Sequence, residues 1–441
     1  MPPYISELPP SSLGIAAPPR RQKNPSVDMW LEDKVATDNA EGLWRLDDGL
    51  YDLTAFIHKH PGGAEWLELS KGLDITEAFE VHHLTEQPKE ILKKYFVRKA
   101  KKKRNSPFTF KEDGFYKTLK REIVKVLPTL PRQSERTTDF FIDSFLVILF
   151  FMGTIACKYW NFFYGTLAGN FLGFLTIAAH NYFHKKDNFR MYYFNFSLQT
   201  VREWRISHVL SHHLHTNTID DYEILSAEPF LNYLPVEKSN FRRYGQWFWA
   251  PVFWSTGFHR AFVGRIVEYI RGRRNHIKKT DFIAFTFPLF MYIFGGQPLL
   301  WTLLMWTYIV VIGSTHLFFV GLHAAHHHPE IFHDGDQPRE EYDWGIGQLD
   351  AIMERKEISG SHFLVLTNFG DHALHHMFPT IDHATLELLY PTFKRVLAEF
   401  GTNLRMVSQL DTLAGGFQQL IKVTPSAAPP DLNKWDINKV K

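Results

Sequence analysis

Histidines occur in three clusters whose spacing suits a metal site. The clusters contain His180 and His184; His208, His212 and His213; and His372, His375 and His376. On a helix, residues three or four positions apart share one face, so each cluster is expected to present its imidazoles in one direction. Imidazole is the commonest metal ligand among side chains. Eight such groups that converge would hold two metal ions without any thiolate.

The single cysteine, Cys157, narrows the chemistry further. One cysteine excludes an internal disulfide, the covalent attachment of a c-type haem and a four-cysteine iron–sulfur site. Any metal must therefore be bound by histidine or carboxylate. With 441 residues, the chain is long enough for a small soluble domain and a larger one. Its net charge of +2 does not indicate a nucleic-acid binder.

Four apolar segments flank the histidine clusters, at 140–157, 159–179, 282–294 and 299–322. At about 1.5 Å of rise per residue, each of the first two covers roughly the ~30 Å hydrocarbon core of a bilayer. In the second segment, Gly165, Gly169 and Gly173 stand four positions apart, which favours close helix packing in lipid. We expect four spans in two hairpins, with the N-terminus, residues 180–280 and the C-terminus on one side of a membrane.

Two motifs near the N-terminus resemble those of cytochrome b5. They are Tyr51-Asp52-Leu53-Thr54-Ala55-Phe56-Ile57-His58-Lys59-His60-Pro61-Gly62-Gly63 and Asp74-Ile75-Thr76-Glu77-Ala78-Phe79-Glu80-Val81-His82-His83. The resemblance implies an α+β domain that binds haem b between His60 and His83, with His82 as the alternative to His83. Because both axial positions would be filled by imidazole, such an iron can only pass electrons.

The three histidine clusters resemble the histidine boxes of the membrane fatty acid desaturase/hydroxylase superfamily. They follow the cytochrome b5-like domain and alternate with paired apolar segments. The resemblance implies an all-α transmembrane domain in which the eight clustered histidines bind two non-haem iron ions. A ninth ligand is common in that superfamily, and His326 is the candidate here, with His323 and His327 as alternatives. Residues 343–348 resemble the Trp-x-x-x-Gln segment of cytochrome b5-fused desaturases. His372 stands where front-end members usually carry Gln, so their regiospecificity does not carry over.

These motifs suggest five regions along the chain. They are a disordered tail (1–25), the cytochrome b5-like domain with a basic linker (26–104), a connector (105–138), the desaturase-like membrane domain (139–400) and a C-terminal tail (401–441).

The combined resemblance, which extends to the insect cytochrome b5-related branch of the fused family, implies a membrane-bound acyl-lipid desaturase with its own electron donor. O2 would oxidise a fatty acyl chain at the di-iron site. NADH-cytochrome b5 reductase would supply the electrons, since the chain has no Gly-x-Gly-x-x-Gly nucleotide loop. The alternatives are a lipid hydroxylase and a haem-binding membrane electron-transfer protein without desaturase activity. Family and topology imply a multi-pass protein of the endoplasmic reticulum membrane, with haem domain and histidine boxes in the cytosol.

Overall fold

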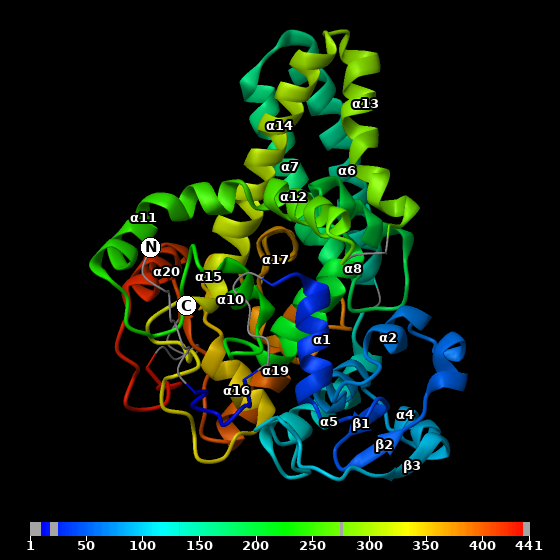
Figure 1. Ribbon diagram of the computed structural model, residues 1–441, viewed down its shortest axis with the longest axis vertical. Coiled ribbons are helices and arrows are strands. Elements are labelled where there is room, and N and C mark those ends of the chain that lie inside the picture. Colours follow the sequence, from blue (N-terminus) through cyan, green and yellow to red (C-terminus); the bar gives the residue numbers. More distant parts are fainter. Residues whose placement is uncertain (1–9, 18–24, 132, 274–276, 435–441) are drawn as a thin grey trace.

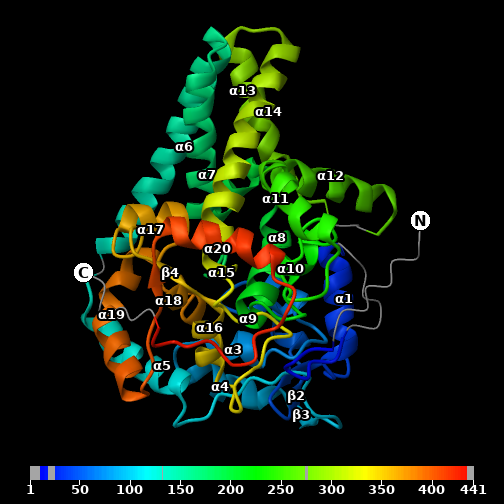
Figure 2. The same ribbon diagram turned by 90° about the vertical axis from the view of Figure 1, so that its left-hand side faces the viewer.

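The chain forms a column of helices that rises from a broad base, as Figure 1 and Figure 2 show. The computed structural model describes residues 10–17, 25–131, 133–273 and 277–434. The N-terminal domain occupies one side of the base, and the segments that carry the histidine clusters lie beside it and under the column.

The N-terminal domain is a small α+β unit, as expected. Its elements are α1 (Val27–Thr37), β1 (Trp44–Leu46), β2 (Gly49–Tyr51), the 3-10 helix η1 (Thr54–Lys59), α2 (Ala64–Leu69), α3 (Thr76–His82), α4 (Gln87–Leu92), the 3-10 helix η2 (Lys93–Tyr95) and β3 (Phe96–Lys99). The strands pair antiparallel in the order β1-β2-β3. Trp44, Leu46, Leu73 and Phe79 are buried in the core of this domain.

The column consists of α6 (Gln133–Tyr159), α7 (Phe162–His180), α13 (Ile283–Gly295) and α14 (Leu299–Thr315), which continues as the π-helical segment η7 (His316–Leu322). Within the described residues, three helices are long and apolar enough to cross a membrane: 135–159, 162–180 and 299–321. Helix α13 has 13 residues. At 1.5 Å per residue that is about 20 Å, which is short of the ~30 Å core. The expectation of four spans is therefore supported for three helices only.

Helix α7 packs closely on α14 and η7 through its glycines. A Cβ placed on Gly173 would lie 2.7 Å from the Cβ of His316, and one on Gly169 would overlap the side chain of Ile312. Gly165 faces the same helix. Larger side chains at these positions would force the helices apart, which explains the four-residue spacing seen in the sequence.

Two further helices, α11 (Asn240–Ser255) and α12 (Gly257–Ile270), lie across the foot of the column (Figure 1). Large apolar side chains on them, including Phe241, Phe248 and Ile270, are exposed. Helices with exposed apolar side chains beside apolar spans are typical of segments that lie in a membrane interface.

The remaining elements form the rest of the base. They are α5 (Phe115–Val126), η3 (Leu127–Thr129), η4 (Phe189–Ser197), α8 (Val201–Trp204), the π-helical η5 (Arg205–His212), α9 (His213–His215), α10 (Tyr222–Ala227), η6 (Lys279–Phe282), α15 (His323–His326), α16 (Trp344–Ala351), β4 (Glu354–Arg355), α17 (His362–Asn368), α18 (His372–Met377), α19 (His383–Glu399), β5 (Met406–Val407) and α20 (Gln409–Ile421).

Three segments that the sequence placed in tails or a connector belong to the folded structure. Helix α5, within 105–138, buries one face against α19. In 401–441, β5 pairs in parallel with β4, and α20 packs on α11 and α15. In the N-terminal tail, Ser11 Oγ and the backbone N–H of Ser12 each donate to the Asp334 carboxylate at 2.8 Å. These contacts join residues far apart in the chain, so local patterns could not reveal them.

Candidate metal centre and haem pocket

The first histidine cluster lies where α7 ends, and the second lies on a π-helical segment. His180 is the last residue of α7, and His184 follows in the next turn. In a π-helix the backbone bonds run from residue i to i+5. His208 and His213, five positions apart, accordingly place their Nε2 atoms 3.0 Å from each other. His212 belongs to a different group of histidines.

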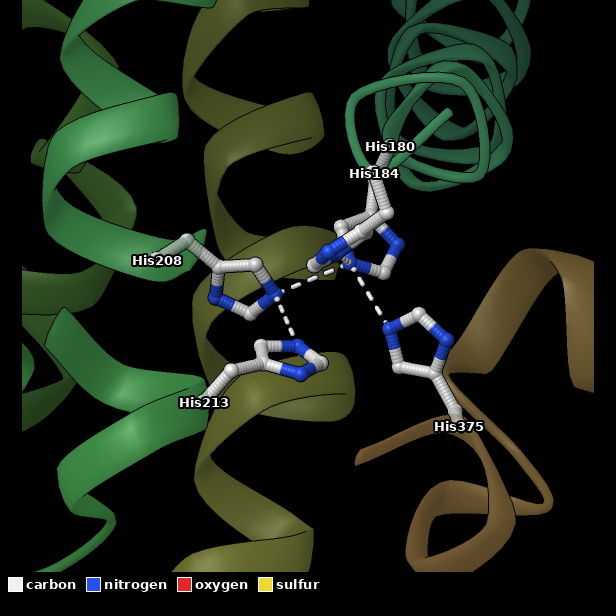
Figure 3. A group of neighbouring side chains, drawn as sticks. All are labelled: His180, His184, His208, His213 and His375. Carbon is white, nitrogen blue, oxygen red and sulfur yellow. Dashed lines mark hydrogen bonds between the residues drawn. The ribbon is translucent and has the colours of Figure 1, made fainter. Parts of the chain in front are cut away.

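The histidines divide into two neighbouring buried groups. The first, drawn in Figure 3, contains His180, His184, His208, His213 and His375; the second contains His212, His326, His372 and His376. Adjacent residues on a helix point about 100° apart, so His375 and His376 enter different groups. The prediction that His372, His375 and His376 point in one direction is thus wrong, because His375 enters the other group. His208 and His212 also enter different groups, although their rings are inclined by only 22° and both lie beside Glu223.

Within each group the Nε2 atoms point at one another. His180 Nε2 lies 2.8 Å from His208 Nε2 and 3.0 Å from His375 Nε2 (Figure 3). In the second group, His326 Nε2 lies 2.6 Å from His372 Nε2 and 3.1 Å from that of His212. Imidazole nitrogens bound at about 2 Å to one shared ion lie about 3 Å apart. Both groups therefore fit a cage around a cation.

His326 lies in the second group, as the sequence analysis expected of a ninth ligand. His327 instead stacks on Tyr233, with 3.5 Å between the ring centres. The side chain of His323 lies outside the part of the chain that the structure describes.

The N-terminal domain contains a cavity of about 570 Å³ between the two predicted axial histidines. The ring centres of His60 and His83 lie 6.2 Å apart across it. His60 Nδ1 is 2.9 Å from the carbonyl oxygen of Gly63, and His83 Nδ1 is 3.0 Å from that of Phe79, so both Nε2 atoms are left for a metal. With metal–imidazole bonds of about 2 Å, the space between the rings fits one iron. His82 stacks instead on His184 of the first histidine group, and this arrangement favours His83 over His82.

Comparisons with known proteins identify the family of each domain. The "Fatty acid desaturase" family model matches residues 158–408, and the "Cytochrome b5-like Heme/Steroid binding domain" model matches residues 31–101. The chain belongs to the fatty acid desaturase family. Its N-terminal domain is a cytochrome b5 domain, which implies haem, and the desaturase domain implies iron. Both histidine groups lie in the desaturase domain, and the three apolar helices agree with the membrane association of this family.

Curated relatives match most of the chain or a short part of it. The chain is 40% identical to the "Cytochrome b5-related protein" of Drosophila melanogaster, over 93% of this chain and 94% of the relative. It is 24% identical to "Acyl-lipid (8-3)-desaturase B" of Dictyostelium discoideum, over 85% and 89% of the two chains. It is 40% identical to mouse "Cytochrome b5 type B" over 17% of this chain and 51% of the relative. No solved structure matches the chain.

Polar groups that the sequence analysis missed hold the histidines of the desaturase domain from behind. Glu223 Oε1 lies 2.7 Å from His208 Nδ1, and Asp221 Oδ2 lies 2.9 Å from His212 Nδ1. Such contacts place the Nδ1 proton on the outside and turn Nε2 toward the metal. The only sequence signal was the acidic pair, which follows the second cluster closely.

The third cluster is held in the same way. His376 Nδ1 lies 2.9 Å from Gln348 Oε1, which places the Trp-x-x-x-Gln segment directly behind a metal-facing imidazole. His375 Nδ1 lies 3.1 Å from His383 Nε2. His383 lies outside the three histidine clusters, so its spacing did not mark it as part of the site.

Burial and mutual repulsion keep most of these imidazoles neutral. Burial, followed by neighbouring imidazoles, lowers the pKa of His213, His375 and His376 well below the usual value. Neutral rings have the lone pair that a metal ion requires. At His212 burial also lowers the pKa, but the carboxylates of Glu223 and Asp221 outweigh it and raise the pKa to about 9. These two carboxylates thus stabilise positive charge at the centre, which a bound cation would also supply.

Proposed function

We propose that this chain is a membrane-bound acyl-lipid desaturase in which the cytochrome b5 domain supplies electrons to a di-iron centre. The observation that carries the proposal is the pair of adjacent all-histidine groups, whose Nε2 atoms converge at 2.6–3.2 Å. Two irons bound there would activate O2. The overall reaction takes two hydrogens from the acyl chain and, with two electrons and two protons, reduces O2 to two waters.

The residues of the chain have distinct tasks in this proposal. The nine histidines hold the metal, and Glu223, Asp221 and Gln348 orient them. Aromatic rings close the first group from water: Phe369 lies 4.9 Å and Trp204 6.4 Å from the ring centre of His180. A dry site strengthens every electrostatic contact within it.

A second cavity, of about 660 Å³, is our candidate site for the acyl lipid, and its wall mixes apolar side chains with charged ones such as Glu203, Arg260 and Glu268. The apolar part of its wall includes Phe253, Trp254 and Val263 of α11 and α12. These two helices also carry exposed apolar side chains. Its wall also includes Trp204 and Glu223, which contact the ring of His208. The cavity therefore joins the predicted membrane interface to the surroundings of the metal centre.

The proposal extends to the partners and location of the protein. Electrons would come from NADH-cytochrome b5 reductase, and the protein would lie in the endoplasmic reticulum membrane with both metal sites in the cytosol. The matches to the cytochrome b5 and fatty acid desaturase families support electron transfer and a lipid substrate.

The test combines metal analysis with lipid profiling. The full chain, expressed in a desaturase-deficient cell, should carry one haem and two non-haem irons and should form a new double bond in acyl lipid. The His60→Ala variant should lose haem absorbance and lipid turnover but keep the non-haem iron, because His60 lies outside both histidine groups. His58→Ala is the matched control, since His58 is exposed.

Three outcomes would contradict the proposal. A hydroxylated lipid product would show a hydroxylase. Iron-free protein with intact haem would show an electron carrier. Full turnover by the His60→Ala variant without added cytochrome b5 would exclude electron supply through the fused domain.

A further inference from the structure

The haem cavity of the cytochrome b5 domain extends to the desaturase domain. Beside His60 and His83, its wall contains His184, Lys185 and Leu210 of the desaturase domain. His184 is a member of the first metal group, and its Nε2 lies 3.2 Å from that of His180. One imidazole therefore borders both the haem cavity and the candidate metal centre.

His82 lies on the cavity wall directly against that imidazole. The ring centres of His82 and His184 are 6.0 Å apart, and the rings are inclined by only 20°. His82 Nδ1 is bonded to the carbonyl oxygen of Ala78 at 2.9 Å. Within the described residues, His82 Nε2 and His184 Nδ1 are both buried and have no hydrogen-bond partner. Unpaired buried polar atoms are rare in native proteins, and each of them needs an explanation.

The docking of the two domains fixes this pair of rings. Arg205, which is fully buried on η5, forms ion pairs with Glu65 at 2.7 Å and with Asp187 at 2.6 Å. Its guanidinium also lies 4.6 Å above the ring of Trp66, and that ring lies 5.9 Å from the ring of His82. The helix that carries the second histidine cluster is thus tied to the wall of the haem cavity.

Glycine at position 63 allows this close approach. Gly63 has φ +116°, a conformation that other residues rarely adopt, and a Cβ there would lie 3.0 Å from the Asp187 carboxylate. The haem-binding loop therefore lies directly against the loop that follows His184.

We propose that His82 is the electron-transfer residue between the haem and the di-iron centre, through its contact with His184. The inference rests on the proposed function, because it needs iron in the first histidine group. With both groups bound, the haem would supply one electron, passing from ferrous to ferric, and one non-haem iron held by the first histidine group would take it, passing from ferric to ferrous. No bond or proton is exchanged. Tunnelling falls exponentially with the gap between donor and acceptor, and the His82 ring occupies part of that gap.

The experiment measures electron transfer separately from lipid turnover. Full-length wild type, His82→Leu and His82→Phe are loaded with haem and iron, and the haem is reduced without O2. Reoxidation of the haem after mixing with O2 and acyl lipid is followed by stopped-flow absorbance. We expect a rate at least tenfold lower for His82→Leu, and a smaller loss for His82→Phe, which keeps an aromatic ring. Haem content, haem potential and iron content should match those of the wild type.

His58→Leu is the matched control, because it removes an exposed histidine from the same domain; its reoxidation rate should equal that of the wild type. An unchanged rate in His82→Leu would overturn the inference, and so would a loss of its haem absorbance, which would make His82 an axial ligand. If the wild type desaturates lipid and His82→Leu transfers electrons equally fast, only the inference fails. If the wild type binds no non-haem iron, the proposed function fails with it.

Discussion

At the scale of single residues, one carboxylate links the two histidine groups. Glu223 Oε1 lies 2.7 Å from Nδ1 of His208 in the first group, and Oε2 lies 3.7 Å from Nδ1 of His212 in the second. The hydrogen-bond acceptor at His212 Nδ1 is Asp221 Oδ2, at 2.9 Å. Glu223 thus orients the ring of His208 by a hydrogen bond, and its charge acts on His212 from a longer distance.

Removal of this carboxylate should weaken metal binding. In Glu223→Ala, the imidazole of His208 loses the partner that fixes its orientation, and loss of such an outer partner typically lowers metal affinity about 10–100-fold. Glu223→Gln should recover part of the affinity, because its amide oxygen can still accept from His208. The measurement is non-haem iron per chain after dialysis against a graded chelator. Glu341→Ala, at an exposed glutamate, is the control; equal iron retention in all variants would contradict the assigned role.

The candidate metal ligands could be predicted from the sequence, but the groups that orient them could not. Imidazoles at helical spacing are visible in the chain, so eight boxed histidines and His326 were named, and the structure brings all nine together. Glu223, Asp221 and His383 were missed, because a side chain that makes one hydrogen bond to a ligand can stand at any distance from it in the sequence. The histidines of the second cluster are divided between the two groups because residues Arg205–His212 form a π-helix. No pattern in the sequence predicts that π-helix.

At the scale of helices, the contact between α7 and α14 holds the metal centre in place. Helix α7 ends at His180, so any displacement of α7 moves a metal-facing ring. The helix approaches its partner most closely at Gly169, where a Cβ would overlap Ile312. This contact was predictable, because small residues at every fourth position are a local signal.

Gly169→Leu should therefore destabilise the protein and reduce its metal content. Overpacking of a well-packed interface typically costs about 1–3 kcal/mol, and here the strain falls on the helix that carries His180. Thermal unfolding in detergent and iron content should both decrease. Gly264→Leu is the matched control, because a Cβ at Gly264 meets nothing within 4 Å. Equal melting temperatures for the two variants would show that the helices can separate at no cost.

Long apolar helices were easier to predict than short elements. The segments that became α6, α7 and α14 could be recognised by length and hydropathy alone. By contrast, α20 and the segment at residues 10–17 gain their order from distant partners such as α11 and Asp334. These segments are stabilised by tertiary contacts, which cannot be recognised from local sequence, and for that reason the sequence analysis assigned them to tails.

At the scale of the whole molecule, the cytochrome b5 domain and the base lie at one end of the helix column, and the loops that join α6 to α7 and α13 to α14 lie at the other (Figure 1). The loop between α13 and α14 contacts the end of α6, since Gln297 Nε2 donates to the carbonyl oxygen of Lys158 at 3.1 Å. Helix α13 thus reaches the same end as the three longer helices although it has only 13 residues. The bilayer would have to thin locally beside it, or α13 would have to be shielded by its neighbours.

Cysteine labelling can test this topology, because the chain has a single cysteine, Cys157, which is buried. In sealed microsomes with the cytosolic face outward, a charged thiol reagent that cannot cross lipid should label Lys101→Cys at once, since Lys101 is exposed on the cytochrome b5 domain. Gln297→Cys should be labelled only after detergent is added, because the column separates it from that domain. The unsubstituted chain should stay unlabelled under native conditions. Labelling of both variants in intact vesicles would mean that α13 and α14 do not form a spanning hairpin, and because Gln297 contacts the end of α6, it would also contradict a crossing by α6 and α7.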